Sequence, residues 1–306
     1  MVVTRIAGWS LMALFFAVVQ STAGPANPIL DAAKRGDVVA LRALLPQQPT
    51  LVNTPAPDGT TALHWATDRD DLAMADLLIR AGANPKAANR YGVTPLYSAA
   101  LNANADMIER LLKAGADANT ALPEGETALM TAARTGKIDA VRVLLDHGAN
   151  VNGKEKWKGQ SALMLAAHEG YADVVKLLAE RGANVNERTA IGFSPILFAS
   201  RQGQVAAIKA LVQAGANVDD MLPDGTSALV VAIQGVNYEA ANTLLELGAN
   251  PNTDRQGWTA LHQIVWSRRP QRGQNNPGQK PQGEMSGPDL ARKLVEHGAY
   301  INARET

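Results

Sequence analysis

The chain has 306 residues, of which 46% are hydrophobic and 19% are charged. This length is about twice that of a usual single domain, and the apolar fraction suffices for a large core. The 29 basic residues balance the 29 acidic ones, so net charge gives no general attraction to nucleic acid or anionic membranes. There is no cysteine, which excludes disulfides, thiolate metal ligands, cysteine nucleophiles and lipid attachment to cysteine.

Residues 1–23 have the order of a secretory signal peptide. Arg5 supplies a positive charge, an apolar stretch runs from Ile6 to Val19, and the small residues Ser21 and Ala23 occupy cleavage-site positions before Gly24. The stretch is shorter than the roughly 20 residues of a spanning helix, and an uncleaved anchor is the alternative. We therefore expect an exported, nearly neutral mature chain that does not insert into a membrane once the signal is removed.

Two glycine positions then recur with a single period over most of the chain. A Gly-Ala pair closes a leucine-rich stretch in seven places, and a second glycine opens each unit 32 to 34 residues after the previous one. The last interval between closing glycines is 50 residues, so that unit carries an insertion. The opening glycines are Gly59, Gly92, Gly125, Gly159, Gly192, Gly225 and Gly257, and the closing ones are Gly82, Gly115, Gly148, Gly182, Gly215, Gly248 and Gly298.

Each unit predicts a turn, a short helix, a second turn and a longer helix. Ser or Thr two residues after the opening glycine suits a helix N-cap, and Pro95 and Pro195 occupy the first helical position. A glycine such as Gly136 separates the helices, and the closing glycine suits a left-handed C-cap. Helices this short do not bury their apolar faces alone, so we expect an all-α repeat solenoid in which neighbouring units cover each other.

These units resemble ankyrin repeats, with the motifs Gly-x-Thr-Pro/Ala-Leu-His-x-Ala-Ala, Val-x-x-Leu-Leu and Gly-Ala-Asn/Asp-Val-Asn. The resemblance covers about residues 26–306. It implies an ankyrin repeat stack with short β-hairpin-like finger loops. It further implies an N-terminal capping unit at 24–57, which lacks the Gly-x-Thr turn, and seven repeats at 58–306. Because such arrays are mostly intracellular in eukaryotes, an exported one without cysteine or an Asn-x-Ser/Thr sequon suggests a bacterial periplasmic or secreted protein.

Several positions depart from the motif. The histidine remains only as His64 and His262. The glycine between the helices is replaced by Asp70, Ala103 and Val236, and we expect those units to be looser there. The last unit carries a Pro-, Gly-, Gln- and Asn-rich insertion at about 267–287, with four basic residues and one acidic residue. This composition predicts a disordered surface loop, with a basic arm that contacts an acidic partner as the alternative.

The resemblance implies a non-catalytic scaffold that binds another protein through its concave groove and its fingertip loops. Nucleotide-binding, nucleophile-elbow, zinc-protease and calcium-loop motifs are all missing from the sequence. His64 and His262 stand six units apart, too far to share a metal, so we predict no catalytic residues, no metal ligands and no cofactor. Lys154–Lys158 is a single basic and aromatic patch, and we expect neither a nucleic-acid partner nor self-association. The alternatives are a repeat module of a longer chain, a structural spacer or, less favoured, an enzyme or small-molecule binder.

Two sets of side chains are candidates for partner binding. Large apolar residues stand near the opening glycines, where water-exposed loop tips should be polar. These are Tyr91, Leu122, Trp157, Ile191, Met221 and Leu222. Packing against the neighbouring finger is the alternative role for them. A polar ladder of Arg134, His168 and Arg201 follows the first helices of three successive units and would face the groove, or else form a solvated helix end.

The signal segment gives the first testable prediction. We expect cleavage after Ala23, because the small side chains of Ser21 and Ala23 fit the site that signal peptidases require. Intact-mass measurement of the exported protein should find Gly24 as the first residue. A mature chain that still carries Met1 would contradict it.

Overall fold

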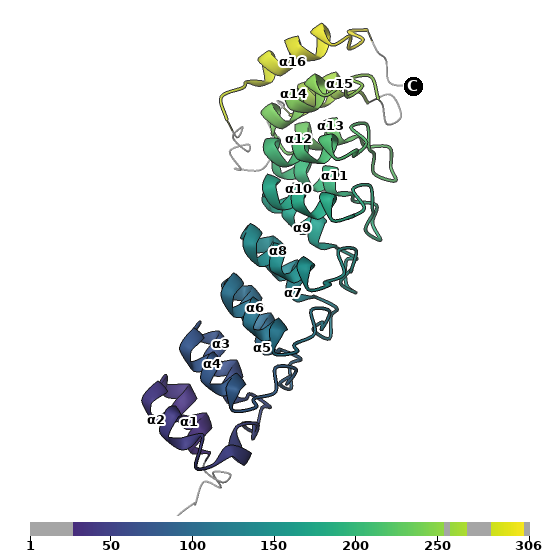
Figure 1. Ribbon diagram of the computed structural model, residues 1–306. Coiled ribbons are helices and arrows are strands. Elements are labelled where there is room, and N and C mark those ends of the chain that lie inside the picture. The colour runs from purple at the N-terminus through teal and green to yellow at the C-terminus, as the bar shows by residue number, and fades with distance from the viewer. Residues whose placement is uncertain (1–26, 254–257, 268–282, 303–306) are drawn as a thin grey trace, which may run out of the picture.

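The computed structural model describes residues 27–253, 258–267 and 283–302, so the expected signal segment and most of the expected insertion lie outside the described residues. Helix pairs stack side by side into an elongated solenoid (Figure 1). The first helices of the pairs are α1 Pro28–Arg35, α3 Ala62–Asp68, α5 Pro95–Asn102, α7 Ala128–Thr135, α9 Ala162–Glu169, α11 Pro195–Gln202, α13 Ala228–Gln234 and α15 Ala260–Ser267.

The second helices run beside the first ones along the whole stack. They are α2 Val38–Leu44, α4 Leu72–Arg80, α6 Ala105–Lys113, α8 Ile138–Asp146, α10 Ala172–Glu180, α12 Val205–Gln213, α14 Tyr238–Glu246 and α16 Gly287–Glu296, with a 3₁₀ turn η1 at Pro49–Leu51. First helices contact the first helices of neighbouring units, and second helices contact second helices. The predicted all-α repeat solenoid is therefore confirmed.

The helices begin where the sequence predicts. The hydroxyls of Thr94, Thr127 and Ser161 accept hydrogen bonds from the amide N–H groups three residues later, at 3.2–3.5 Å. Pro95 and Pro195 occupy the first helical position, where no backbone donor is needed. Each first helix is therefore started by its own residues, and stacking then fixes its place in the solenoid.

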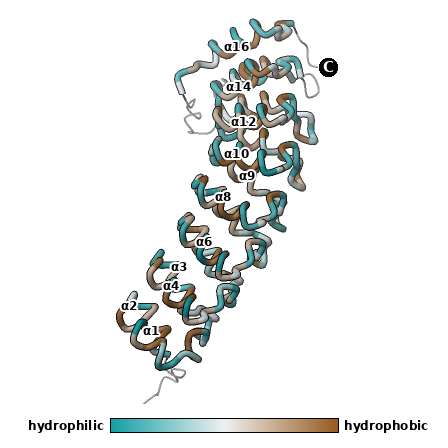
Figure 2. The backbone as a smooth tube through the Cα atoms, in the orientation of Figure 1, coloured by the Kyte–Doolittle hydropathy of each residue, from teal (hydrophilic) through white to brown (hydrophobic). Residues whose placement is uncertain are grey.

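Apolar burial joins the units. The residue two positions after the N-cap, leucine or, in one unit, Ile196, is at most 2% exposed in the internal units, as in Leu63, Leu96 and Leu129. Small residues, mostly alanine, surround it and let the helices of adjacent units approach closely. Apolar and polar residues alternate along each helix, as expected for elements with one buried side (Figure 2).

A ladder of side-chain amides keeps the units in register. Asn119 donates to the carbonyl of Gly148 in the next unit at 3.0 Å and accepts from the N–H of Asn150 at 2.7 Å. Asn152 and Asn186 make the same pair of bonds one and two units further on. Each asparagine thus satisfies two backbone groups at the end of a second helix and fixes the offset between neighbours.

His64 adds a bond between units near the start of the stack. Its Nδ1 accepts from the N–H of Thr61 at 3.1 Å, and its Nε2 lies 3.0 Å from the carbonyl oxygen of Val93 in the next unit. A carbonyl only accepts, so Nε2 carries the proton. Burial lowers the pKa of His64 below its ordinary value. The carbonyl of Val93 and the carboxylates of Asp68 and Asp58 act in the other direction but are outweighed. The neutral ring therefore acts as a structural clamp.

Three turns between the helices of a pair have no glycine, yet they keep the left-handed backbone conformation of the turns that have one. Asp70, Ala103 and Val236 have φ of 56°, 54° and 58°, in the left-handed region. The expected loosening is therefore not visible in the backbone. The neighbouring units help to hold these turns, since Asn104 donates to the carboxylate of Asp70 at 2.8 Å and Asn237 to the carbonyl of Arg201 at 2.8 Å.

The end of the expected insertion is ordered and belongs to the fold. The N–H of Glu284 donates to the Glu239 carboxylate at 2.9 Å, and Met285 packs against the core. Ser286 caps α16 by accepting from the N–H of Asp289 at 3.3 Å. The helix therefore starts at Gly287, inside the range assigned to the loop, because this Ser-x-x-Asp capping box was not recognised in the sequence.

The turns between the two helices of a pair predict opposite effects for two reciprocal substitutions. Ala103→Gly should raise the free energy of unfolding by about 1 kcal/mol, because glycine adopts the left-handed conformation without the strain of a Cβ. Gly136→Ala should lower it by more than that, since the new Cβ would also lie 2.5 Å from the Tyr171 ring. Denaturant unfolding of both variants checks the signs, and a destabilised Ala103→Gly protein would contradict the strain argument.

Candidate partner-binding surface

Finger loops project from one side of the solenoid, ahead of the first helices α3 to α13 (Figure 1). Backbone hydrogen bonds close them. The N–H of Asn89 donates to Val93 at 3.0 Å, and the N–H of Gly92 donates to Asn89 at 2.9 Å. Isolated antiparallel bridges lie at the base of three fingers, which agrees with the hairpin-like form expected from the sequence. The fingers stack closely enough that a Cβ on Gly92 would lie 2.7 Å from the Pro123 ring of the next finger.

The backbone pairing shows which tip residues are equivalent. In each described finger, one backbone N–H of the first arm donates to a carbonyl of the second arm. The residue with this N–H starts the turn, and the tip residue stands two positions later. The tips that follow from this rule are Asp58, Tyr91, Glu124, Trp157, Ile191 and Asp224. Acidic and apolar tips are thus mixed along the row, and sequence analysis did not recognise the acidic ones.

The three apolar tips are strongly exposed. The exposed fraction is 59% for Tyr91, 81% for Trp157 and 68% for Ile191. Successive helices lie about 8–10 Å apart, so these tips, spread over three unit steps, span roughly 24–30 Å along one side of the stack. We name Tyr91, Trp157 and Ile191 the tip row.

Leu122 and Leu222 are placed differently from the sequence expectation. Both start the turn of their finger, their N–H groups donating at 2.9 Å to Glu126 and Thr226, and both side chains are half-buried. Met221, next to Leu222, is 40% exposed and belongs to a bridge with Ser227. Nearness to the opening glycine therefore grouped residues that occupy different positions in their fingers, and these three do not extend the tip row.

The Trp157 finger is held by one carboxylate. Glu155 accepts from the N–H groups of Trp157 at 2.6 Å, Lys158 at 2.8 Å and Gln160 at 2.9 Å. Partial burial alone would raise the pKa of Glu155. The three N–H groups and the Lys158 cation together lower it by more than burial raises it, so the pKa lies below its ordinary value. This finger has one residue more than the others, Lys158, whose ammonium group lies 4.4 Å from the centre of the indole ring.

A cation also lies over the tyrosine of the tip row. The Arg90 guanidinium is 4.9 Å from the Tyr91 ring centre and donates to its hydroxyl at 2.8 Å. Together with Lys158 it places a positive charge beside two of the three exposed apolar groups. Such cation–π contacts pre-order the rings while leaving their outer faces accessible.

The predicted polar ladder occupies equivalent positions but is already engaged. Arg134 is paired with the carboxylate of Glu126, and Arg201 lies 5.7 Å from the Phe193 ring centre. His168 lies 2.9 Å from the amide nitrogen of Gln202 in the next unit and packs edge-on against a phenylalanine. Leu101 holds the same position one unit before Arg134 and is 56% exposed; the 33-residue spacing alone would have found it.

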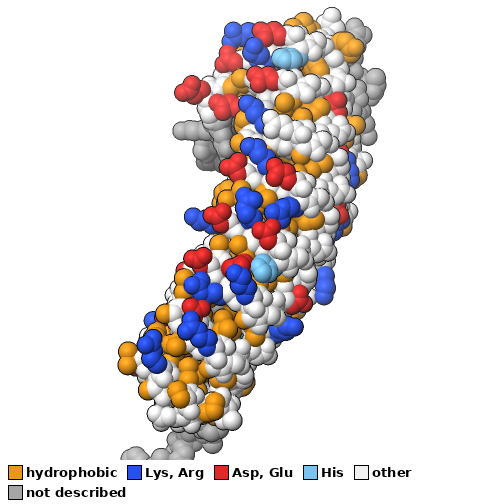
Figure 3. Space-filling model, viewed as in Figure 1, with side chains coloured by type: hydrophobic (Ala, Val, Ile, Leu, Met, Phe, Trp, Pro, Cys, Tyr) orange, Lys and Arg blue, Asp and Glu red, His pale blue; other side chains and the backbone are white. Residues whose placement is uncertain are grey.

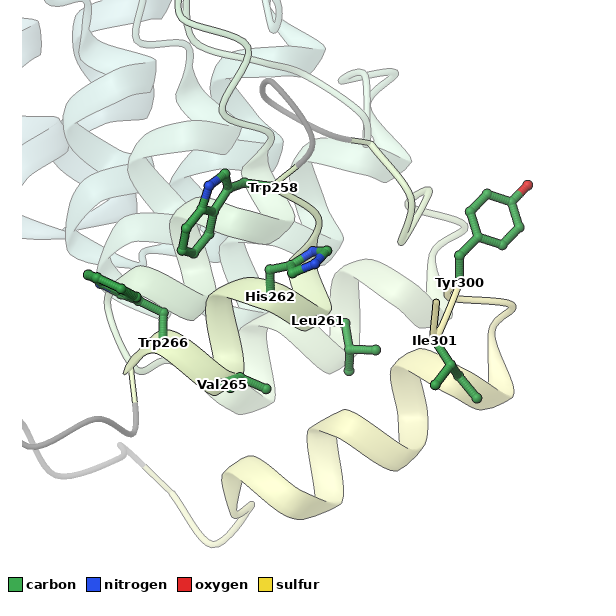
Figure 4. Close-up of a pocket in the computed structure, with 7 residues that line it drawn as sticks. All are labelled: Trp258, Leu261, His262, Val265, Trp266, Tyr300 and Ile301. Atoms are coloured by element: carbon green, nitrogen blue, oxygen red, sulfur yellow. The ribbon is translucent and has the colours of Figure 1, made fainter. Parts of the chain in front are cut away.

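A cavity of about 240 Å³ lies at the far end of the stack, and sequence analysis missed it (Figure 4). Trp258 and Trp266 meet edge to face there at 5.5 Å, on the same side as His262. The remaining lining residues are Leu261, Val265, Tyr300 and Ile301. The available signal was the gathering of aromatic residues in the last unit, at positions that are mostly polar in the others.

The second helices carry charges of both signs. Arg110 pairs with Asp76 at 2.9 Å and Arg181 with Asp146 at 2.8 Å, each across neighbouring units. Red and blue side chains are accordingly interspersed over this face (Figure 3). Exposed pairs of this kind add little stability.

Two features are absent from the described ranges. No group of three or more His, Asp or Glu side chains in 27–253, 258–267 and 283–302 is arranged to hold a metal ion. No helix in the same part of the chain has the length and hydropathy needed to cross a bilayer.

A stack of helix pairs with closed, projecting fingers defines a repeat scaffold whose extended side is a binding surface. The family model described as ankyrin repeats (3 copies) matches residues 29–121, 104–189 and 192–272. The chain therefore belongs to the ankyrin repeat family. Ankyrin repeat domains are protein–protein interaction modules, and the fold is generally a non-catalytic scaffold. The predicted family and class of function are confirmed.

Curated relatives match over short stretches. Notch-regulated ankyrin repeat-containing protein A of Danio rerio is 32% identical over 85 residues, 27% of this chain and 76% of that protein. The putative E3 ubiquitin-protein ligase XBAT31 of Arabidopsis thaliana is 31% identical over 78 residues, 25% of this chain. The match spans only 17% of the Arabidopsis protein.

Solved structures match over more of the chain. The human ASB11 ankyrin repeat domain superposes with a TM-score of 0.64 at 28% identity, covering 73% of this chain and 99% of that one. The ankyrin repeat domain of Bcl-3, a member of the IkappaB protein family, gives a TM-score of 0.61 at 28% identity. The match covers 68% of this chain and 94% of that one.

The Glu155 site yields a prediction for the Trp157 finger. Glu155→Gln should lower the free energy of unfolding by about 1 kcal/mol at neutral pH, because N–H bonds to an ionised acceptor are stronger than those to a neutral one. The pKa of Glu155 is lower in the folded chain than in the unfolded chain. The contribution of its charge to stability is therefore complete above the pKa of the unfolded chain, and it is lost as the pH falls through the pKa of the folded chain. Denaturant unfolding of both proteins should show the difference shrinking on acidification. A difference independent of pH would contradict the role of the charge.

Proposed function

We propose that this ankyrin repeat protein binds a partner protein along the tip row, without catalytic chemistry of its own. The observation that carries the proposal is the exposure of Trp157, at 81%, in a finger that the Glu155 carboxylate already holds. Exposed aromatic groups in a row are characteristic of interaction surfaces, and tryptophan and tyrosine are favoured anchors. The curated relatives and solved neighbours named above support binding as the function.

The tip row also favours a kind of partner. Its length of roughly 24–30 Å fits one side of a standard protein interface. Arg90 and Lys158 lie on the rings of Tyr91 and Trp157, and the Lys156 ammonium reaches the carbonyl of Pro123 at 3.1 Å. Glu124 stands between Tyr91 and Trp157 in the row, so the row carries both signs of charge. A partner surface that combines apolar side chains with carboxylates opposite Arg90 and Lys158 and a basic group opposite Glu124 therefore fits best.

The polar ladder is a second tier of the proposed surface. The side chains of Arg134, His168 and Arg201 are fixed by contacts to Glu126, Gln202 and Phe193. A pre-ordered side chain loses little entropy on binding. We assign these three residues to orienting the partner, with the tip row supplying most of the affinity.

Export is part of the same proposal. The charged, apolar and small-residue order of residues 1–23 supports a periplasmic or secreted location in a bacterium, and the partner is then sought in that compartment.

The test compares Trp157→Ala with a matched control, Val39→Ala. Val39 is also 81% exposed, but it lies on α2, away from the fingers. Each protein is immobilised and exposed to extract of the compartment, and retained proteins are quantified by mass spectrometry. The partner should be retained by the wild type and by Val39→Ala and be lost with Trp157→Ala.

Titration calorimetry with that partner should then show a loss of about 2 kcal/mol or more for Trp157→Ala. The free energy of unfolding should change by less than about 1 kcal/mol, because the ring is exposed. An unchanged affinity in Trp157→Ala, Tyr91→Ala and Ile191→Ala would overturn the proposed surface. A collapse of stability would show that the indole has a folding role.

A further inference from the structure

One rung of the amide ladder differs from the others in the residue that follows its asparagine. In the described part of the chain, each ladder asparagine donates to the carbonyl of a closing glycine one unit further on. The asparagines and the residues that follow them are Asn53–Thr54, Asn119–Thr120, Asn152–Gly153, Asn186–Glu187 and Asn252–Thr253. No other Asn-Gly pair occurs in the 306 residues.

The backbone at Gly153 does not require a glycine. Gly153 is not among the residues with φ in the left-handed region, and its N–H donates to the carbonyl of Asn150 at 3.2 Å. The N–H groups of Thr120 and Glu187 close the same turn in their own units, at 3.1 and 3.3 Å. A side chain is therefore compatible with this position, and the turn does not explain the glycine.

An asparagine before a glycine is open to attack by its own backbone. Because glycine has no Cβ, little hinders the approach of the Gly153 nitrogen to Cγ of Asn152. Solvent removes the N–H proton, a bond forms between this nitrogen and Cγ, and the bond from Cγ to Nδ2 breaks. Nδ2 takes up a proton and leaves as ammonia, so that a cyclic imide remains. Water then opens the imide at either carbonyl to give aspartate or isoaspartate.

Water has access to the site, but the fold restrains the reacting groups. Asn152 is exposed. Its amide donates to the carbonyl of Gly182 at 3.1 Å and accepts from the N–H of Asn184 at 2.9 Å, while the N–H of Gly153 is held in its turn. The attack therefore requires these bonds to open together. Exposed loop bonds open at a much lower free energy than that of global unfolding, so the folded chain reaches this state.

We propose that Asn152 is a site of spontaneous deamidation in the folded protein, and that its conversion loosens the junction between two fingers. Asn152 lies at the base of the Trp157 finger, and its ladder partners Gly182 and Asn184 precede the Ile191 finger. An ionised aspartate has no donor, so an oxygen faces the Gly182 carbonyl in place of an N–H group. Isoaspartate also lengthens the main chain by a methylene group.

Another rung already contains the product of this change. Asp219 stands at the ladder position two units after Asn152. It accepts from the N–H of Asn250 at 2.7 Å, which is one of the two bonds of a rung. Its ionised carboxylate has no N–H for the carbonyl of Gly248, so the other bond is missing. The stack tolerates such a rung, and we therefore expect the deamidated chain to stay folded but to be less stable.

Peptide mapping by mass spectrometry of the folded chain, incubated at mildly alkaline pH, tests the site. Aspartate and isoaspartate should accumulate at Asn152 before they do at Asn119 and Asn186, which make the same bonds but precede larger side chains. A sample unfolded in denaturant should react faster at Asn152, because the ladder is absent. The proposal is overturned by equal rates at the three asparagines, or by an Asn152 that stays intact in the folded chain long after the unfolded sample has been converted.

Gly153→Thr is the matched control, since a threonine follows Asn119 in the same turn. This variant keeps Asn152 and its two ladder bonds, and deamidation at Asn152 should fall to the level seen at Asn119. Deamidation at the wild-type rate in Gly153→Thr would show that the glycine is not the cause and would overturn the proposal.

Two reciprocal substitutions measure the consequence for the junction. Asn152→Asp should raise the equilibrium constant of unfolding about fivefold, the equivalent of one net hydrogen bond. Asp219→Asn should lower it by a similar factor, because the new amide donates to the carbonyl of Gly248. Denaturant unfolding at neutral pH gives both values, and an unchanged constant in Asn152→Asp overturns the loosening. These measurements involve no partner protein, so they are independent of the tip row.

Discussion

Everything in this structure depends on each helix pair being covered by its neighbours. One pair exposes a side made of leucine and alanine, and the next pair removes that side from water. Leu63 and Leu129 are therefore fully buried, whereas the equivalent Leu261 of the last described unit is only half-buried. The elongated shape, the amide ladder of Asn119 and Asn152, and the His64 clamp all serve this single contact, repeated along the chain. In the described part of the chain the main helix contacts join each unit to the units directly before and after it, so a surface residue belongs to a local neighbourhood of two or three units.

Much of the fold could be predicted because its signals recur within each unit. The N-caps, the proline at the first helical position and the leucine pairs are local patterns, and the structure reproduces them. The turns at Asp70, Ala103 and Val236 were harder, because the residue type suggests a looser turn while contacts from the next unit, such as that of Asn104, help to hold the left-handed conformation. That information is tertiary, so a single sequence does not contain it.

The binding surface was predicted only in part, for a similar reason. Trp157, Tyr91 and Ile191 were recognised from size and position, and they lie at the tips. Leu122 and Leu222 were grouped with them because all of these residues stand close to an opening glycine. Backbone pairing is the better measure, since it shows that both residues begin a turn and that Lys158 lengthens one finger. The side chains of Tyr91, Trp157 and Ile191 take no part in this pairing. The acidic tips differ, because Asp58 and Asp224 accept hydrogen bonds from the N–H groups of Thr60 and Thr226.

The stack determines how the tip row meets a partner. Tyr91, Trp157 and Ile191 lie on one side of the solenoid, in units that follow one another at a regular spacing. Because each unit is held by its neighbours, the distances between these three side chains vary little. A partner that contacts all three therefore meets a surface that is already formed, and less entropy is lost than in ordering a flexible loop.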